Sequence, residues 1–359
     1  MTHEVGQTCA FACLCCCCLV CVIVLVSGAH GGRPAGGRDT CFVPRALYTD
    51  NASVGVSVAA SCTGQRVAVA TTSGAVYAWL LDEATGVYTA RARQTIVPPG
   101  ADAQSVALSC SGRTLAVGLG NGSALVFTLG PAHALAAAHN GTKTARAVRL
   151  SCRGDVLLTV PLLDGGLVYV GNASAGDLTA GPRVEPGPVG AAVTCAGTHV
   201  ALAQAGVVRV YAVPSWRLTA SIDDGTLGSG PLSVSTAGHA ADVLAVGVVN
   251  ASGVKVFVRN GTTYTAVAAV RQPGQPGFAR VVTLDWAARN LAVAAADNVT
   301  VWQWNTLLAR FTLMHGLPVA GTGADAVLSH DGTVTLTTGH TPAYVACAGK
   351  TGSGVCPPC

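Results

Sequence analysis

Residues 105–129 read SVALSCSGRTLAVGLGNGSALVFTL. Short runs of apolar residues alternate with segments rich in Gly, Asn and Ser, which are the residues that tight turns prefer. The third apolar run contains an aromatic residue, Phe127. This stretch therefore predicts three antiparallel strands joined by two short turns, and it shows no helical period.

The same unit recurs along the chain. The turn after the first strand is marked by Cys62, Cys110, Cys152, Cys195, Thr236, Trp286 and His330. An aromatic residue marks each third strand, at Tyr77, Phe127, Tyr169, Tyr211, Phe257, Trp302 and Tyr344. Repeats of about 40 to 50 residues that contain four strands are typical of propeller blades. We predict an all-β fold, a seven-bladed β-propeller over residues 51–347.

The repeats resemble two families of propeller proteins. Residues 329–332, Ser-His-Asp-Gly, are similar to the turn of WD-repeat proteins. Residues 256–270 and 278–295 are similar to FG-GAP repeats of the integrin-α type. No Asp-x-Asp-x-Asp-Gly loop accompanies them, so the resemblance implies no calcium site, and we predict no metal site.

Closure of the ring requires the first and last repeats to meet. Residues 41–43 lie upstream of the first repeat, and the last repeat has three clear strands, so the N-terminal segment is expected to complete the last blade. Cys41 would then lie near a cysteine at the C-terminal end, where a disulfide would lock the ring. The candidates for that pairing are Cys347, Cys356 and Cys359.

Four further cysteines occupy equivalent positions on successive repeats. They are Cys62, Cys110, Cys152 and Cys195. Two interpretations stay open: disulfides between the neighbours 62–110 and 152–195, or four buried thiols.

A long apolar run opens the chain. It spans residues 9–26 and is followed by Ser27 and Ala29, small residues that suit signal-peptide cleavage. The run is long for a signal peptide and close to the minimum for a membrane span. We interpret 1–29 as a signal peptide or signal-anchor, 30–50 as a linker that can supply the ring-closing strand, and 348–359 as a Cys/Pro/Gly-rich tail.

Asparagines are concentrated in glycosylation acceptor sequences. Seven N-x-Ser/Thr sites occur, at Asn51, Asn121, Asn140, Asn172, Asn250, Asn260 and Asn298. This excess, together with the apolar leader, predicts an extracytoplasmic glycoprotein that is secreted or anchored in the membrane by its N-terminal segment. None of the sites lies on a turn between first and second strands, so we expect one face of the propeller to be free of sugar.

Composition excludes several function classes. Charged residues make up only 11% of the chain and the net charge is +4 without basic clusters, which argues against disorder and against nucleic acid as a partner. Histidines are scattered and acids are scarce, so no catalytic constellation and no cofactor are predicted, and we expect a protein that is not an enzyme. Cys356-Pro357-Pro358-Cys359 is followed by no helix and reads as a terminal staple.

The tripeptide Arg153-Gly154-Asp155 lies on the predicted turn of the third repeat. It resembles an integrin-recognition loop, in which a turn presents a cation and a carboxylate to a receptor. The alternative is that Gly154 serves the turn alone, because Gly64 and Gly112 occupy the same position in other repeats.

These observations predict a recognition module that binds a protein, and a cell-surface receptor is one candidate partner. The first alternative is a viral or parasite surface or secreted glycoprotein that engages host receptors. The second is a propeller lectin or hydrolase with a site in the central channel. The third is an intracellular WD-repeat scaffold, which the acceptor sequences disfavour.

Overall fold

The protein is described by a computed structural model. It covers residues 42–47, 53–82, 87–139, 145–161, 166–172, 177–184, 190–204, 206–223, 225, 227, 232–248, 253–272, 278–296, 298–318, 325–329, 334–337 and 343–348. The chain divides into two compact units, Met1–Asp39 and Thr40–Cys359, and every described residue belongs to the second.

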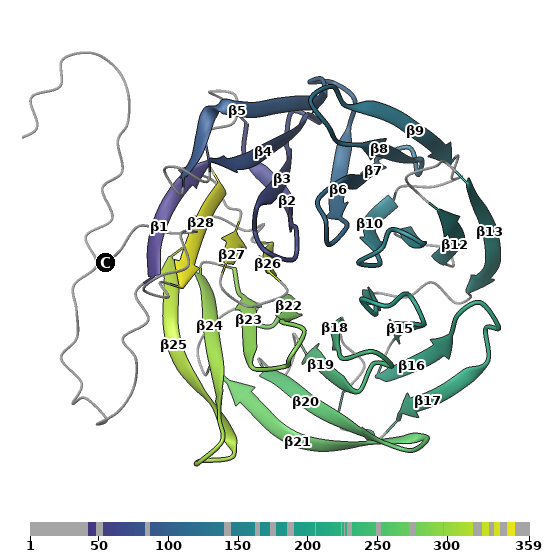
Figure 1. Ribbon diagram of the computed structural model, residues 1–359. Helices are drawn as coiled ribbons and strands as arrows, with labels where there is room; N and C mark the ends of the chain where they lie inside the picture. Colours follow the sequence, from purple (N-terminus) through teal and green to yellow (C-terminus); the bar gives the residue numbers. More distant parts are fainter. Residues whose placement is uncertain are drawn as a thin grey trace, which may run out of the picture. The chain divides into compact units, whose positions relative to one another are not determined.

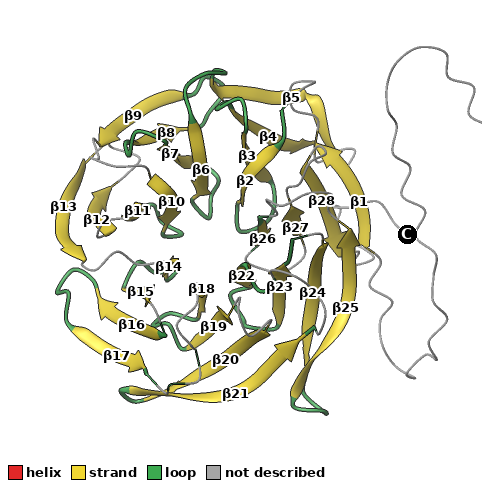
Figure 2. Ribbon diagram, turned by 180° about the vertical axis from the view of Figure 1, so that it is seen from behind, coloured by secondary structure: helices red, strands yellow, loops and turns green. Residues whose placement is uncertain are grey.

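The described strands form seven antiparallel four-stranded sheets, which are arranged around a central axis (Figure 1). Each sheet, called a blade below, has its first strand nearest the axis and its fourth strand at the rim, as the view from the other side also shows (Figure 2). The β-propeller predicted from the repeat pattern is thereby confirmed.

The strand bounds follow the chain in order. Blades one to three contain β2 (Gly55–Ala60), β3 (Arg66–Thr71), β4 (Val76–Asp82) and β5 (Val87–Val97); β6 (Ala103–Leu108), β7 (Thr114–Leu119), β8 (Ala124–Thr128) and β9 (Ala134–His139); and β10 (Ala145–Leu150), β11 (Val156–Pro161), β12 (Gly166–Asn172) and β13 (Asp177–Val184). Blades four and five contain β14 (Gly190–Val193), β15 (His199–Gln204), β16 (Val207–Ala212) and β17 (Leu218–Ile222); and β18 (Leu232–Ala237), β19 (Val243–Val248), β20 (Gly253–Asn260) and β21 (Thr263–Arg271). Blades six and seven contain β22 (Val281–Leu284), β23 (Asn290–Ala294), β24 (Asn298–Asn305) and β25 (Arg310–Pro318); and β26 (Ala326–Leu328), β27 (Val334–Thr337), β28 (Ala343–Ala348) and β1 (Phe42–Leu47).

The last blade is made from both ends of the described chain. β1 pairs antiparallel with β28, with Val43 opposite Cys347 and Leu47 opposite Ala343. The order β26-β27-β28-β1 therefore places the N-terminal strand at the rim of blade seven. Because the first and last segments share one sheet, the ring is closed by backbone hydrogen bonds.

The second strands form the buried centre of the blades. Val67, Ala68 and Val69 of β3 are fully buried, and so are the residues at the corresponding places of β7, β19 and β23. A second strand is covered on both faces by the sheets of neighbouring blades, so apolar residues occupy every position rather than alternate ones. Small Ala and Val side chains allow these sheets to pack closely face to face.

Blade five departs from the predicted repeat phase. In blades one to three, the backbone N–H of the residue at the turn position donates a hydrogen bond to the next blade, for example from Cys62 N to Cys110 O. In blade five, the equivalent bond runs from Gly238 N to Trp286 O. The turn position of blade five is therefore Gly238, not Thr236. Thr236 lies within β18, and its hydroxyl donates to Val193 O. The Ser-Thr sequence there imitates a turn, which is why pattern matching placed it two residues too early.

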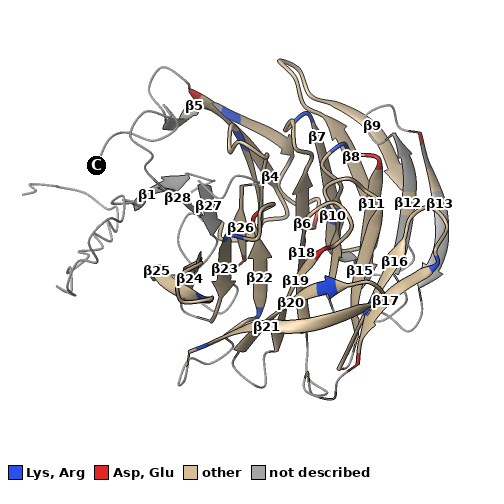
Figure 3. Ribbon diagram, turned by 60° about the horizontal axis from the view of Figure 1, so that its bottom comes forward, with Lys and Arg blue, Asp and Glu red and all other residues tan. Residues whose placement is uncertain are grey.

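Charged residues are few and scattered over the described strands and turns (Figure 3). Within the same described part of the chain, no helix is long and apolar enough to cross a membrane.

Candidate functional site

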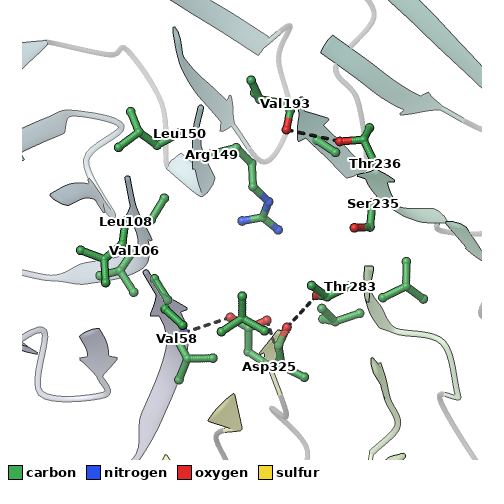
Figure 4. A pocket seen from close by; sticks show the side chains of 18 of the residues that line it. Val58, Val106, Leu108, Arg149, Leu150, Val193, Ser235, Thr236, Thr283 and Asp325 are labelled. Atoms are coloured by element: carbon green, nitrogen blue, oxygen red, sulfur yellow. Dashed lines mark hydrogen bonds between the residues drawn. The ribbon is translucent and has the colours of Figure 1, made fainter. Parts of the chain in front are cut away.

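The first strands of the blades line an axial channel. One part of it is a cavity of about 190 Å³ whose walls are mostly Val, Ala and Leu side chains, with Ser235, Thr236 and Thr283 as hydroxyl-bearing residues (Figure 4). Arg149 of β10 points from one wall toward the middle of the channel, and Asp325 lies on the wall across from it. Most of the side chains that line this cavity are apolar, and Arg149 and Asp325 are the charged ones among its described lining residues.

Asp325 is fixed by hydrogen bonds to the neighbouring blade. Its Oδ2 accepts from the Ser57 hydroxyl and from Val58 N, both at 3.1 Å, and its Oδ1 accepts from Ala326 N at 3.0 Å. Burial raises the pKa of Asp325, while the Arg149 guanidinium and these hydrogen bonds act in the opposite direction. The carboxylate therefore serves chiefly as an acceptor that joins blade seven to blade one.

The same position carries a serine in three other blades, and in two of them the hydroxyl accepts a backbone hydrogen bond from the next blade. Ser57 Oγ accepts from Val106 N at 3.3 Å, and Ser105 Oγ accepts from Val148 N at 3.0 Å. Each of these side chains lies five residues before its turn position and joins its blade to the next one. Such acceptors stabilise the interfaces because they satisfy a backbone N–H that is buried at the axis.

One mouth of the channel is lined by cysteines. Cys62 is bonded to Cys110 and Cys152 to Cys195, with Cα atoms 4.5 Å apart in each pair. These are the two neighbour pairs that the repeat positions allowed. Backbone hydrogen bonds from Cys62 N to Cys110 O, Cys110 N to Cys152 O and Cys152 N to Cys195 O hold the four turns in a row. Trp286 lines the same mouth in blade six.

This mouth defines one face of the propeller, called the cysteine face below. In an antiparallel four-stranded meander, the turn between strands one and two lies at the same end as the turn between strands three and four. The cysteine face therefore contains both sets of turns. Six exposed large apolar side chains lie in or near its third-to-fourth connections: Leu80, Leu135, Leu218, Val258, Leu307 and Leu308.

Exposed apolar side chains gather most densely on blades five and six. We call the rim patch the set Val258, Val267, Leu307, Leu308, Leu313 and Met314. Leu307, in the turn between β24 and β25, is 94% exposed. The rim strands β21 and β25 contact each other between the blades, so the patch extends across both. Exposed apolar side chains that gather on neighbouring strands are typical of interaction sites.

Aromatic packing supports the hairpin that carries Leu307 and Leu308. The rings of Trp304 and Phe311 pack edge to face with centroids 5.2 Å apart, and Phe311 is buried. Arg310, beside the turn, is exposed, and so is Arg289 of the same blade, whose carbonyl accepts from Trp304 N at 2.7 Å. The hairpin thus presents two leucines on a supported base, with arginines close to them in the fold.

The Arg153-Gly154-Asp155 turn is in place, but its carboxylate faces the protein. Arg153 is exposed, and Gly154 has φ +79°, the left-handed conformation that favours glycine. The Ser151 hydroxyl donates to Asp155, and a Cβ placed on Gly197 of the next blade would lie 2.7 Å from Asp155 Oδ1. Integrin recognition stays a prediction, and this geometry gives Asp155 a role in the turn instead.

Two glycosylation acceptors are exposed in described turns. Asn121 lies between β7 and β8, and Asn260 ends β20. Asn298 is only partly buried at the start of β24, while Asn172 ends β12 and its side chain is outside the described part. The remaining acceptors, Asn51, Asn140 and Asn250, lie outside the described residues. Occupancy of every acceptor stays a prediction.

The structure places acceptor asparagines on the cysteine face, which the sequence predicts to be free of sugar. Asn260 pairs with Thr263 at the turn between β20 and β21, and that turn lies on the cysteine face. Asn172 pairs with Asp177 at the corresponding turn of blade three. The alternating direction of the strands brings third-to-fourth turns to the same face as first-to-second turns, so the absence of acceptors from first-to-second turns does not leave that face without acceptors.

Several cysteines of the predicted disulfides lie in parts of the chain that the structure does not describe. Cys41, Cys356 and Cys359 lie outside the described residues, and only the backbone of Cys347 is described, within β28. The alternative of a hydrolase requires acidic residues in the channel, and among the described residues that line it Asp325 is the single acid. Glycoside hydrolysis requires a pair of carboxyl groups, so the described channel gives that alternative no support.

No protein-family model matches the chain, and no curated protein matches it in sequence. Solved propellers match it in fold. The β-propeller domain of Cps50 (Swd1) from Myceliophteria thermophila has a TM-score of 0.68 at 10% identity and covers 86% of this chain and 100% of that chain. The WD40 repeats of RRP9 have a TM-score of 0.65 at 14% identity, covering 85% and 97%.

A third neighbour is a chain of the Mitotic Checkpoint Complex, with a TM-score of 0.64 at 17% identity, covering 90% of this chain and 99% of that chain. At these identities the likeness shows the fold alone, which is a β-propeller of the WD40 type. The resemblance to WD-repeat proteins is thereby confirmed at the level of the fold. The resemblance to FG-GAP repeats finds no support in these neighbours.

Proposed function

We propose that this protein is a recognition module, a glycosylated, extracytoplasmic seven-bladed propeller that binds a protein partner through the rim patch and the adjoining cysteine face. The observation that carries the proposal is the rim patch itself, where Leu307 is 94% exposed and Leu308 52% exposed on a hairpin supported by packed aromatic rings. WD40-type propellers of known structure include a chain of a multiprotein complex, which fits a role in binding.

The chemistry of the patch indicates the kind of partner. Exposed arginines, Arg289 and Arg310, lie on the same blade as the two leucines. Asp285, the acid nearest in sequence to Arg289, is buried and accepts hydrogen bonds from Arg289 N and Asn290 N at 2.7 and 3.0 Å. The patch therefore fits a protein surface that combines apolar and acidic side chains, because the apolar contacts supply affinity and the charges set orientation.

The binding surface can be located by cross-linking. A photoreactive benzophenone side chain is introduced at Leu307 in one full-length protein and at Gln104 in another. Gln104 is exposed at the start of β6, at the opposite end of the blades from the cysteine face. We expect specific protein adducts from position 307 and none from position 104. Adducts from 104 alone would contradict the assignment of the surface.

Affinity for the partner so identified provides the quantitative test. L307D with L308D is expected to weaken binding about tenfold or more, as removal of central apolar contacts does. R289E with R310E is expected to slow association and to reduce its dependence on salt. The matched control, Q104E, should leave the affinity unchanged. Equal affinities for all the variants would overturn the proposed surface.

The compartment is tested separately. The full chain is expressed in secreting cells, and mass spectrometry determines its mature N-terminus, its presence in medium or membranes, and the occupied acceptors. We expect glycans at Asn121 and Asn260, since both are exposed in turns. Protein without glycans would reject the extracytoplasmic part of the proposal and favour an intracellular scaffold, while leaving the rim patch as a binding surface.

A further inference from the structure

Three sulfur atoms lie close together at the cysteine-lined mouth of the channel, and a fourth, Cys195 Sγ, is bonded to one of them. Besides the two disulfides, Cys62 Sγ lies 4.0 Å from Cys152 Sγ, and the sulfurs of Cys62, Cys110 and Cys152 all lie within 4.8 Å of one another. A tetrahedral zinc ion with Zn–S bonds of about 2.3 Å holds its sulfurs about 3.8 Å apart. We propose that Cys62, Cys110, Cys152 and Cys195, when reduced, form a four-thiolate site for a zinc-class metal ion on the propeller axis.

The backbone already holds these four residues together. The chain of hydrogen bonds from Cys62 to Cys195 joins neighbouring turns without using any side chain, so it persists when the disulfides are opened. The site would then need side-chain rotation and little change in the backbone. Each ligand comes from a different blade, so a bound ion would link blades one to four in place of the two covalent bonds.

Reduction of the two disulfides, which must precede metal binding, requires a reductant, and a dithiol supplies the electrons and protons. Each disulfide takes two electrons and two protons from one dithiol, which becomes a cyclic disulfide, and two cysteine thiols are released. Four thiols then bind one Zn²⁺ and release four protons as they become thiolates. The site is thus disulfide-bonded in an oxidising compartment and metal-bound in a reducing compartment.

The ring tolerates other residues at this position. Gly238 and Trp286 occupy the equivalent places in blades five and six, where backbone hydrogen bonding is retained without a cysteine. The cysteines are therefore not required to build the turn. Substitution of one or two of them should remove the metal site and leave the fold in place.

The test uses Co²⁺, whose spectrum reports tetrahedral thiolate ligation. The background is the full chain with C356S and C359S, so that the two thiols of the tail do not compete for the ion. After reduction and removal of oxygen, we expect about one equivalent of Co²⁺ to give intense sulfur-to-cobalt charge-transfer bands and tetrahedral ligand-field bands. Zn²⁺ should displace it and raise the Tm of the reduced protein, whereas the oxidised protein should show neither effect.

Two variants decide the assignment. C62S with C152S should abolish the spectrum while circular dichroism shows a folded propeller. C195H should keep the metal and shift the ligand-field bands to shorter wavelength, because one sulfur is replaced by nitrogen. An unchanged spectrum in both variants, or no tetrahedral spectrum in the folded, reduced background protein, would overturn the proposal. Failure of this test leaves the rim patch untouched, since none of its residues lies at the channel mouth.

Discussion

Two tyrosines connect the rim of a blade to the turn at its axis. Tyr264, the second residue of β21, donates from its hydroxyl to Ala241 O at 2.6 Å. Tyr88, the second residue of β5, donates in the same way to Gly64 O. Burial raises the pKa of Tyr264 to about 12 and also raises the pKa of Tyr88, so both hydroxyls stay protonated as donors. A single side chain thereby joins strand four to the connection between strands one and two.

Removal of this hydroxyl gives a prediction at the residue scale. Y264F should lower the free energy of unfolding by about 1 kcal/mol, because the hydrogen bond is lost and the Ala241 carbonyl is left without its partner inside a partly buried turn. Y211F is the matched control, since the Tyr211 hydroxyl has no hydrogen bond within the described part of the chain. Chemical denaturation of both variants measures the difference. Equal stabilities of Y264F and Y211F would show that a water molecule replaces the hydrogen bond of the Tyr264 hydroxyl without loss of stability.

Strand β19 shows how closely the blades pack. Gly247 is the fifth of its six residues, and a Cβ added there would be 2.3 Å from both Ala279 O and Ser233 Oγ and 3.0 Å from Val282 Cγ1. The Ser233 hydroxyl donates to Ala279 O across the interface of blades five and six, at 3.0 Å. Glycine at this point therefore allows one blade to approach the next.

We expect G247A to destabilise the protein by about 1 to 3 kcal/mol, the usual cost of adding a methyl group to a filled interface. The control is G316A in β25, where nothing lies within 4 Å of the added Cβ. That change should be neutral or slightly stabilising, because alanine restricts the unfolded chain. Thermal unfolding of the two variants compares them directly. A G247A protein as stable as G316A would mean that the blades can separate at this interface without loss.

At the scale of elements, the sequence predicts what depends on local pattern. The aromatic markers from Tyr77 to Tyr344 all fall in third strands, and the apolar triplets such as Leu115–Val117 are fully buried second strands. The turn of blade five is predicted two residues too early, because Ser235 and Thr236 within β18 resemble the Ser or Thr that precedes the turn cysteine in blades one to four. The rim patch could not be predicted either. Its residues belong to strands and a turn of two blades, and no local pattern in the sequence shows that their side chains are exposed.

Closure of the ring depends on the interface between blade seven and blade one, which are far apart in the sequence. Blades one to six follow one another along the sequence, whereas blade seven must join blade one across the closing point. β1 supplies backbone pairing at the rim, and Asp325 supplies three hydrogen bonds at the axis, two of them to blade one. Serines suffice at the corresponding positions of blades one and two. A carboxylate accepts more hydrogen bonds than a hydroxyl, and here Asp325 accepts from two atoms of blade one, Ser57 Oγ and Val58 N.

Because Asp325 titrates, its contribution to the stability of the closed ring depends on pH. Burial raises the pKa of Asp325 above its ordinary value of 3.8, so the folded protein binds this proton more tightly than the unfolded chain does. The contribution of the group to stability is therefore full below about pH 4 and decreases as pH rises through the pKa of the folded state. D325S introduces the serine that other blades use and removes this titration. The difference in free energy of unfolding, wild type minus D325S, should decrease as the pH rises from about 4 to about 8.

Denaturation curves at several pH values measure that difference, and S105A provides the control for loss of an interface hydrogen bond alone. S105A removes the bond to Val148 N and should cost about 1 kcal/mol at every pH, because no titrating group is changed. A constant difference for D325S would mean that Asp325 titrates alike in the folded and unfolded chains. A difference that increases with pH would reverse the sign, and hydrogen bonding rather than burial would then govern the carboxylate at the closing point of the ring.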